Sequence, residues 1–326
     1  MEPTHRHFAD QAAVPALVAE IAGRHGRPAA AILDDLARQL REFFDQSFAS
    51  DTAPSRFAAA GSALVRPRAL VALSGGIDSA VAVFLAVRAL GREAVLPVTM
   101  PGRPGDESPE LAALVRDALG FDEPDAPYLI DLAPLVAEHM RLMSALPAEQ
   151  LRLGLSHADQ RREQKMRSGN FASRARVAVL SDLQRAIRGR IIGTVNRTEY
   201  CQGYGTKFGT PISYDFGLLN ELYKVEIYEL GRLLGVPQLI LDTPPSTGYF
   251  EGQTHAGELG ASIEEQDIFA YLLFERRLSP DEIAARYGAS AEFARVMERR
   301  WHVSAHKRAL NGLQPYARVA ASPLML

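Results

Sequence analysis

The segment from Ser74 to Ser79, which reads SGGIDS, constrains the fold of this chain more than any other. The apolar run 70–73 before it has the pattern of a short strand, and residues 79–90 after it carry apolar side chains at helical spacing. A glycine-rich turn between a strand and a helix lets backbone N–H groups converge on an anion at the positive end of the helix. The sequence therefore predicts a phosphate site at this turn.

Polar side chains within the same turn support this prediction. Ser74 and Ser79 supply hydroxyl groups, and Asp78 supplies a carboxylate that can hold a magnesium ion beside phosphates. The lysine of the Walker A pattern is absent, so the turn does not have the sequence of an ordinary P-loop. Packing alone could also explain a Gly-Gly turn, but it does not account for the two serines and the aspartate.

The composition narrows the class of protein. Of 326 residues, 47% are hydrophobic and 23% are charged, which is typical of a globular protein with a well-buried core. The net charge of −3 offers no general attraction to nucleic acid or to an anionic membrane, so we expect neither as a partner. Cys201 is the sole cysteine, which excludes an intrachain disulfide, and no secretory signal or membrane-length apolar run is evident. We therefore expect a cytoplasmic protein.

Strand and helix patterns alternate through the middle of the chain. Strand-like runs are expected at 69–73, 94–99, 127–131 and 190–195, with helices at 79–90, 109–119 and 160–188. This alternation predicts an α/β fold, a doubly wound parallel sheet with flanking helices on both faces. In such a sheet, ligands gather at the carboxyl ends of the strands, where the Ser74–Ser79 turn and the segment after Thr194 are expected to lie.

The two ends of the chain are predicted to be helical. Residues 11–48 hold two helical patterns, and 49–66 are rich in Ala, Ser and Pro, so 1–66 is interpreted as an N-terminal helical extension and linker. Residues 67–326 would then form the main domain. Its C-terminal part begins with an amphipathic helix at 221–235 and continues with two or three short helices over 263–302.

Further segments match one known family in sequence and spacing. They are 169–176 (GNFASRAR), 193–209 (GTVNRTEYCQGYGTKFG), 222–230 (LYKVEIYEL), 245–254 (PSTGYFEGQT) and 304–308 (SAHKR). Together with SGGIDS, these segments resemble the ammonia-dependent NAD synthetases of the N-type ATP pyrophosphatase superfamily. The resemblance spans about residues 69–310.

The resemblance implies a fold, a reaction and partners. The fold would be adenine nucleotide alpha-hydrolase-like, so that 67–326 form an ATP pyrophosphatase domain. The carboxylate of nicotinic acid adenine dinucleotide (deamido-NAD) would attack the α-phosphorus of ATP, and ammonia would convert the NAD-adenylate to NAD, with AMP and pyrophosphate released. Magnesium would be the cofactor and ATP the co-substrate. A homodimer is expected, and a separate glutaminase subunit could supply ammonia, because no amidase domain is evident in this chain.

The resemblance also implies roles for individual residues. The ATP-binding positions would be Ser74, Gly75, Gly76, Asp78, Ser79, Thr194, Lys224 and Ser246. The magnesium ligands, which are also the catalytic carboxylates, would be Asp78 and Glu199. The contacts to deamido-NAD would come from Arg174, Lys207, Asp215, His306 and Lys307.

Several of these side chains also have simpler interpretations. Glu199 could be a surface carboxylate, Arg174 could belong to a solvated helix face, and Lys224 could lie on the exposed side of its helix. His302 and His306 are four residues apart, but no third zinc ligand is evident near them. Cys201 has no His-Asp pattern nearby and is interpreted as a small packed residue.

The sequence departs from the family pattern in segments that the resemblance assigns to the acid substrate and to ammonia. The segment 210–218 is one residue longer than expected and has Leu218 where the family has proline. His255 and Ala256 stand where the family has Asp and Glu, and the loop at 100–108 is unusual. Two alternatives therefore remain open beside NAD synthesis. One is an adenylating amide ligase for a different carboxylate, and the other is a nucleotide-binding homologue without turnover.

Overall fold

A parallel sheet forms the centre of the computed structural model, which describes residues 7–52, 67–121, 128–145, 157–210, 212–246, 248 and 253–311. Within these ranges the sheet has the strand order β2-β1-β3-β4, and each neighbouring pair is parallel. The strands are β1 (Ala69–Ala72), β2 (Val95–Val98), β3 (Arg190–Gly193) and β4 (Phe216–Gly217). The predicted α/β fold with a parallel sheet and flanking helices is confirmed.

Two details of the sheet differ from the sequence-based expectation. The strand expected at 127–131 is wrong: Leu129 forms an isolated parallel bridge to Thr99, and residue 127 lies outside the described residues. Leu129 is also exposed, so this segment lacks the two-sided burial that a strand inside such a sheet has. The sheet instead gains β4, whose two residues are too few to produce a strand pattern in the sequence.

Side chains of β1 alternate between two hydrophobic cores. Ala69 and Val71 pack in the first core, whereas Leu70 packs in the second. The first core is shared with α2, α3, α4 and α9, and the second with α7. Both faces of the sheet are therefore covered by helices, as the burial of alternate residues requires.

The strand order determines where a ligand can bind. From β1 the chain crosses to β2 on one side, and β3 lies on the other side of β1. Between β1 and β3 the loops that leave the strands diverge, and this switch point is where open α/β sheets bind ligands. The Ser74–Ser79 turn follows β1, and Thr194 follows β3. The topology thus brings these two segments to one edge of the sheet.

Most helices occur where periodicity predicts them. Those before the C-terminal part are α1 (Ala13–Gly23), α2 (Ala29–Thr52), α3 (Ile77–Leu90), α4 (Ser108–Leu119), α5 (Ala133–Ser144), α7 (His157–Ile187) and α8 (Arg197–Gln202), with a 3-10 turn η1 (Arg92–Ala94). The C-terminal part has α9 (Lys224–Leu234), α10 (Gln238–Asp242), α11 (His255–Leu259), α12 (Ile263–Ala270), a π-helix η2 (Tyr271–Glu275), α13 (Pro280–Tyr287), α14 (Ala291–Val303) and α15 (Ala305–Asn311). Helices α5, α8, α10, α11 and α15 lie outside the helical ranges expected from the sequence.

Local sequence signals explain where several helices begin and end. Capping boxes, in which the N-cap side chain and the N3 glutamate bond each other's backbone N–H, start α12 at Ser262 and α13 at Ser279. Gly120 ends α4 and Gly235 ends α9, both in the left-handed conformation that glycine adopts at low cost.

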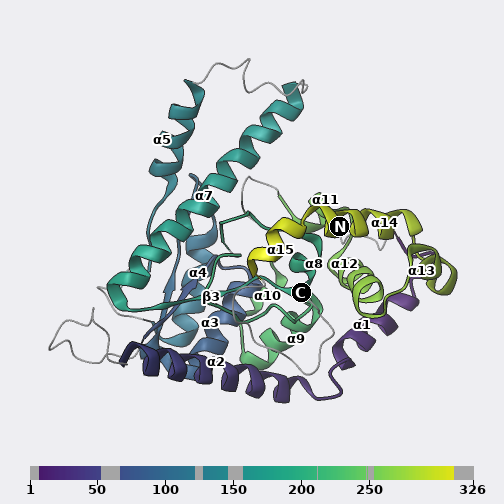
Figure 1. Ribbon diagram of the computed structural model, residues 1–326, viewed down its shortest axis with the longest axis horizontal. Helices are drawn as coiled ribbons and strands as arrows, with labels where there is room; N and C mark the ends of the chain where they lie inside the picture. Colours follow the sequence, from purple (N-terminus) through teal and green to yellow (C-terminus); the bar gives the residue numbers. More distant parts are fainter. Residues whose placement is uncertain are drawn as a thin grey trace.

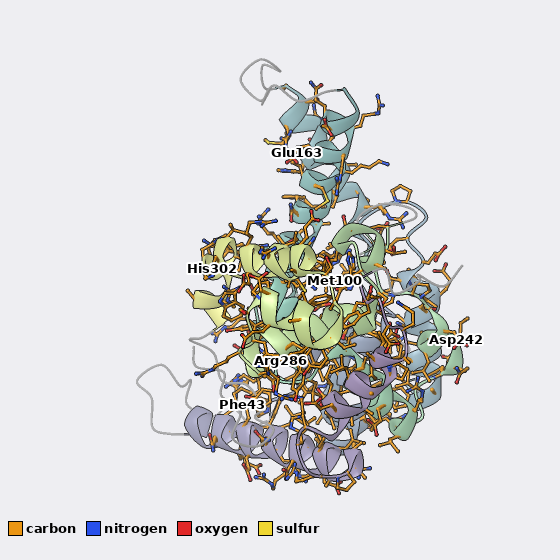
Figure 2. The ribbon with its side chains drawn as sticks, turned by 90° about the vertical axis from the view of Figure 1, so that its right-hand side faces the viewer. Phe43, Met100, Glu163, Asp242, Arg286 and His302 are labelled. Carbon is orange, nitrogen blue, oxygen red and sulfur yellow. The ribbon has the colours of Figure 1, made fainter. Side chains whose placement is uncertain are left out.

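Helices α5 and α7 project together from the body of the molecule (Figure 1). They pack against each other through His139 and Phe171, whose rings stack with centroids 3.6 Å apart. Figure 2 shows Glu163 on the part of α7 that extends beyond the rest of the fold. No helix within the described ranges is both long enough and apolar enough to cross a membrane.

The helices of the predicted N-terminal extension pack onto the rest of the chain. In Figure 1, α2 runs along one side of the molecule beneath α3 and α9. Phe43 of α2 stacks on Phe216 of β4, with ring centroids 4.8 Å apart. Helix α1 contributes Leu17 and Ile21 to a third core, which it shares with α12, α13 and α14. The domain boundary after residue 66 stays a prediction, and residues 53–66 are outside the described ranges.

A buried ion network joins the end of α1 to α9 and η2. The guanidinium of Arg24 lies 3.0 Å from Glu226 Oε2 and 3.1 Å from Glu275 Oε1, and its side chain is 6% exposed. Arg197 of α8 lies 2.7 Å from the same oxygen of Glu275. The ring of Tyr223 lies beneath both guanidinium groups, 4.9 and 5.4 Å from their carbons. Because α9 begins next to Tyr223, this network supports the first turn of that helix.

Replacing Arg24 by methionine should lower the free energy of unfolding by about 3–5 kcal/mol, because it leaves Glu226 and Glu275 buried without this partner. Arg38→Met is the matched control, since Arg38 pairs with Glu42 at 2.8 Å on an exposed surface. The control should change stability by about 1 kcal/mol or less. Urea unfolding followed by circular dichroism measures both, and equal losses would contradict a special role for the Arg24 network.

Candidate functional site

The turn after β1 has the conformation that the sequence predicts for an anion site. Gly75 has a φ of +79°, and a Cβ at this position would collide with Leu111. Ser74 Oγ lies 3.1 Å from Ser79 Oγ and accepts a hydrogen bond from Gly76 N at 3.4 Å. Helix α3 begins after Gly76 without a side-chain cap, so its first N–H groups remain available to an anion.

Three charged side chains meet beside this turn. Lys224, the first residue of α9, forms an ion pair with Asp78 in the first turn of α3, and its Nζ lies 3.7 Å from Glu199 Oε1 in α8. The lysine is only 2% exposed, so the interpretation that it lies on an open helix face is wrong. Glu199 is largely buried as well, with 11% of its side chain exposed. We call Asp78, Glu199 and Lys224 the charged cluster.

Asn196 holds the charged cluster together from the loop after β3. Its Nδ2 donates to Asp78 Oδ1 at 3.0 Å, and its Oδ1 accepts from Glu199 N at 2.9 Å. The second of these bonds is half of a capping box that starts α8. Asn196 is not among the site residues expected from the sequence. The signal that could have found it is the N-cap residue three positions before a glutamate.

Burial and charge set the protonation of the charged cluster. Burial raises the pKa of the Glu199 carboxyl to about 7, while Lys224 opposes this rise and Asp78 adds to it. For Lys224, burial disfavours the charged form, but attraction to Asp78 and Glu199 outweighs it, so the pKa of the lysine is raised. The lysine therefore keeps its charge, and Glu199 gains or loses its charge near neutral pH.

The donors of the charged cluster fit a magnesium ion that has phosphate and water among its ligands. Asp78 and Glu199 provide carboxylate oxygens, the protein ligands that Mg²⁺ prefers. Within the described ranges no group of three or more His, Cys, Asp or Glu side chains could enclose a metal by itself. Magnesium commonly binds through one or two carboxylates and the phosphates of a substrate, so this pair is sufficient for that mode.

A buried aspartate fixes the relative positions of α8, α9 and α12. Asp267 accepts hydrogen bonds from Thr198 Oγ1 and, at 2.8 Å, from Val225 N. Burial raises the pKa of its carboxyl to about 7, and the two hydrogen bonds oppose that rise. Asp267 was missed in the sequence because a single acidic residue in an otherwise ordinary helix pattern carries no functional signal.

The remaining predicted ATP residues lie in different surroundings. Thr194 is half-buried and follows the last residue of β3 directly, at the switch point of the sheet. Ser246 is exposed in the loop between α10 and α11, where its Oγ accepts from Gly248 N at 3.0 Å. Gly248 O in turn accepts from Arg103 Nε at 3.1 Å, so this loop meets the unusual loop after β2. Among the residues that the structure describes, neither a hydrogen bond nor an ion pair joins Ser246 to the charged cluster.

Three of the cations expected to bind the dinucleotide gather around the turn after α8. Lys307 Nζ donates to Gly203 O at 2.7 Å and to Gly205 O at 2.8 Å. Arg174 Nε donates to the carbonyl of Lys207 at 3.1 Å, which brings α7 to the same turn. His306, which precedes Lys307, is exposed on α15.

Asp215 is placed apart from these cations. Its Oδ2 accepts from Ile191 N of β3 at 2.7 Å and from the side-chain amide of Gln184 in α7. Burial raises the pKa of its carboxyl, while the bond from Ile191 opposes the rise. These bonds attach α7 and the start of β4 to the middle of β3. In the described ranges the carboxylate contacts neither Arg174 nor Lys307.

Cys201 agrees with its interpretation as a small packed residue, and His302 and His306 lie on the surface. Cys201 is fully buried in the third core, and burial raises the pKa of its thiol to about 12. His302 and His306 are both exposed, and in the part of the chain that the structure describes no third potential ligand forms a metal-binding group with them.

A small pocket opens beside the charged cluster, between α8, α11 and α12. Its lining consists of Asn196, Thr198, Glu199, Gln202, Lys224, His255, Leu259, Ile263 and Gln266. His255, which stands where the family pattern has an aspartate, is thus part of the site. Glu199 and Lys224 belong to both the charged cluster and this pocket.

Comparisons with known proteins identify relatives over most of the chain. A family model described as NAD synthase matches residues 66–311. The NH(3)-dependent NAD(+) synthetase of Pyrococcus furiosus is 33% identical over 241 residues, which are 74% of this chain and 85% of that protein.

Among solved structures, NMN synthetase from Francisella tularensis superposes with a TM-score of 0.62 at 24% identity, covering 90% of this chain and 99% of that one. The NH3-dependent NAD synthetase of Campylobacter jejuni gives a TM-score of 0.57 at 22% identity, covering 85% and 96%. At these identities the two structures show that the fold is shared.

The Cys201 thiol should resist alkylation in the folded protein, because burial and its raised pKa leave almost no accessible thiolate. Iodoacetamide at pH 8, followed by mass spectrometry of the intact chain, should leave the native protein unmodified over a time in which the urea-unfolded chain reacts completely. Modification of the native protein at the rate of the unfolded chain would mean that this thiol is exposed and available as a nucleophile.

Proposed function

Because this chain belongs to the NAD synthase family, we propose that it is a ligase that makes NAD from deamido-NAD, ATP and ammonia. The carboxylate of deamido-NAD attacks the α-phosphorus of ATP, which gives an NAD-adenylate and pyrophosphate. Ammonia then attacks the activated carbonyl, and AMP leaves. The charged cluster beside the open N-terminus of α3 is the observation that carries this proposal.

The residues around α3 are suited to the polyphosphate of ATP. The N–H groups that begin α3 have no side-chain cap and can donate to phosphate oxygens. The hydroxyls of Ser74 and Ser79 bond each other, and Ser79 Oγ donates to Gly76 O at 2.9 Å, so each hydroxyl would have to rotate to donate to a phosphate. Lys224 brings a positive charge to the same place from the start of α9. When magnesium is bound by Asp78 and Glu199, it offsets charge on the departing pyrophosphate. Thr194 and Ser246 complete the proposed ATP contacts.

Cations around the turn after α8 support a dinucleotide with its own pyrophosphate. Arg174 and Lys307 donate to backbone carbonyls of this turn, Lys207 belongs to it, and a planar guanidinium can bind a phosphate through two parallel hydrogen bonds. The pyrophosphate of deamido-NAD would lie against these side chains and His306. Asp215 is retained as a proposed contact, although its carboxylate is directed at Ile191 and Gln184 here.

The nitrogen donor and the assembly are proposals of the same kind. A glutaminase needs an accessible reactive cysteine, and Cys201 is buried with a raised thiol pKa. We therefore propose free ammonia as the donor for this chain, with glutamine used only through a separate glutaminase subunit. A homodimer and a cytoplasmic location, both expected from the sequence, stay predictions.

The departures from the family pattern support a second candidate, the same adenylating chemistry on a different carboxylate. His255 and the longer 210–218 segment depart from the family pattern in motifs that the resemblance assigns to the acid and to ammonia, whereas the charged cluster is complete. The presence of all three residues of the charged cluster argues against the other alternative, a nucleotide-binding homologue without turnover. Such a protein has no need for a buried Asp-Lys-Glu arrangement.

Incubation of the chain with Mg²⁺, ATP, deamido-NAD and ammonium tests the proposal. NAD, AMP and pyrophosphate should form in equal amounts, without ADP. Glu199→Gln should lower turnover roughly 10²-fold, by analogy with the loss of one transition-state stabiliser. Glu163→Gln is the matched control, because Glu163 is exposed on the projecting part of α7.

Each alternative gives a different result in the same assay. ADP and orthophosphate as the main products, or normal turnover by Glu199→Gln, would contradict the proposal. AMP formation with another acid, such as nicotinic acid mononucleotide, but not with deamido-NAD would favour the second candidate. Binding of ATP without any exchange of pyrophosphate into ATP would favour the homologue without turnover.

A further inference from the structure

Arg24, which follows α1 directly, donates hydrogen bonds to the segment 221–226 at the start of α9. Its Nε and Nη2 bond the two carboxylate oxygens of Glu226 at 3.1 and 3.0 Å, and Nη2 also donates to the carbonyl of Glu221. Lys224 lies between these two points of attachment along the chain. Helix α1 itself packs against α9 and α12 (Figure 1). The guanidinium of Arg24 thus holds the chain both before and after the lysine of the charged cluster.

Glu226 caps the helix that Lys224 begins. Its Oε2 accepts a hydrogen bond from the backbone N–H of Tyr223 at 2.8 Å, which is half of the capping box of α9. The side chain of Glu226 is 3% exposed, so its charge needs a donor or cation opposite it. Besides Arg24, His25 faces this carboxylate, with Nε2 2.9 Å from Glu226 Oε1. Two consecutive residues of the N-terminal segment are therefore directed at the group that begins α9.

Attachment of α1 to the fold does not explain the buried charge of Arg24. The helix already packs through Leu17 and Ile21 in the third core, and Glu20 accepts a hydrogen bond from Tyr271 Oη at 2.8 Å. Replacing a buried ion pair by apolar side chains of similar size is often neutral or stabilising, so packing alone would favour an apolar residue at position 24. The buried guanidinium instead points to a need for a defined geometry in the segment that it bonds.

The backbone at Lys224 is also held from α8 and α12. Lys224 N donates to Thr198 Oγ1 at 3.4 Å, and Val225 N donates to Asp267 Oδ2 at 2.8 Å. These bonds hold the first two residues of α9, and Arg24 holds the chain on either side of them. With its backbone fixed in this way, Lys224 extends its side chain from a defined origin toward the two carboxylates of the charged cluster.

We propose that Arg24 is a positioning residue for the reaction, which acts through Glu226 to keep the ammonium of Lys224 at the two carboxylates of the charged cluster. This role rests on the proposed function. It adds a residue that lies outside 66–311, the part of the chain that the family model matches. In this role the N-terminal segment is a working part of the site, although Arg24 touches no substrate.

The loss of Arg24 would act on ATP in two steps. Glu226 would lose its guanidinium partner, and a buried carboxylate in that state moves toward solvent or takes up a proton. Either change weakens the capping box, so the first turn of α9 shifts and carries Lys224 with it. The phosphates of ATP would then lose part of the contact that Lys224 is proposed to make with them.

Binding of a non-hydrolysable ATP analogue with Mg²⁺ tests the proposal without turnover. Arg24→Met should raise the Kd of the analogue about tenfold, the effect of losing one hydrogen bond to a charged group. Ile21→Ala is the matched control, because it removes a fully buried side chain from the same helix and destabilises α1 without touching a charge. The control should bind the analogue as the wild type does. Isothermal titration calorimetry measures each Kd at a temperature where circular dichroism shows the variant to be folded.

Steady-state kinetics give a second, independent readout. In Arg24→Met, kcat for NAD formation should fall roughly tenfold or more, since a shift of about 1 Å near the reacting atoms can have an effect of that size. The KM for deamido-NAD should stay near its wild-type value, because the cations proposed to bind it lie on α7, on α15 and in the turn after α8. Arg24→Met should reduce kcat less in a Glu226→Gln background, where the amide oxygen can still cap α9 and no buried charge is left without its partner.

Several outcomes would overturn the proposal. They are an unchanged Kd in Arg24→Met, an equal rise of the Kd in Arg24→Met and Ile21→Ala, and the same fold-loss of kcat with and without Glu226→Gln. If Arg24→Met does not fold, Arg24→Lys takes its place under the same criteria, because a lysine keeps the charge but lacks the planar group that bonds Glu226 and the Glu221 carbonyl together. If the wild type formed no NAD while the Kd still depended on Arg24, the proposed function would fail and the positioning role would stand.

Discussion

The ammonium of Lys224, buried between two carboxylates, is the interaction on which the rest of the site depends. A lone charge of this kind is too costly to bury, so Lys224 can occupy its position only because Asp78 and Glu199 face it. Those two carboxylates come from the segments after β1 and after β3, and the lysine begins α9. Electrostatic attraction therefore holds three chain segments together at the switch point of the sheet, beside the first N–H groups of α3.

Further polar and charged side chains hold the charged cluster in position. Asn196 spans Asp78 and the start of α8, and Asp267 ties α8 to the second residue of α9. Further out, Arg24 at the end of α1 neutralises Glu226 in the first turn of α9. The N-terminal helices thus contribute to the site through the helix that carries Lys224, although none of their side chains lines the pocket.

Local features of the site could be predicted from the sequence, and long-range ones could not. The Ser74–Ser79 turn was predictable because a strand, two glycines and a helix start lie within a few residues. The burial of Lys224 was not, because its partners lie far away in the chain and a lysine at a helix start is ordinarily solvated. Strand β4 has two residues, which are too few to show an alternation of apolar and polar side chains. Leu129 lies in a strand-like sequence, but within the described residues it forms a single bridge to Thr99. His255 was visible as a departure from a pattern, but its place in the pocket beside Glu199 and Lys224 depends on segments that lie far apart in the chain.

A double-mutant cycle between Lys224 and Asp78 tests this account most directly. The free energy of unfolding is measured for the wild type, Lys224→Met, Asp78→Asn and the double variant, at one pH and without ligands. If the buried ion pair holds the segments together, Asp78→Asn should cost far less in the Lys224→Met background, with a coupling energy of about 1–3 kcal/mol. Additive effects, within about 0.5 kcal/mol, would contradict the account and reduce Lys224 to an independent side chain of α9.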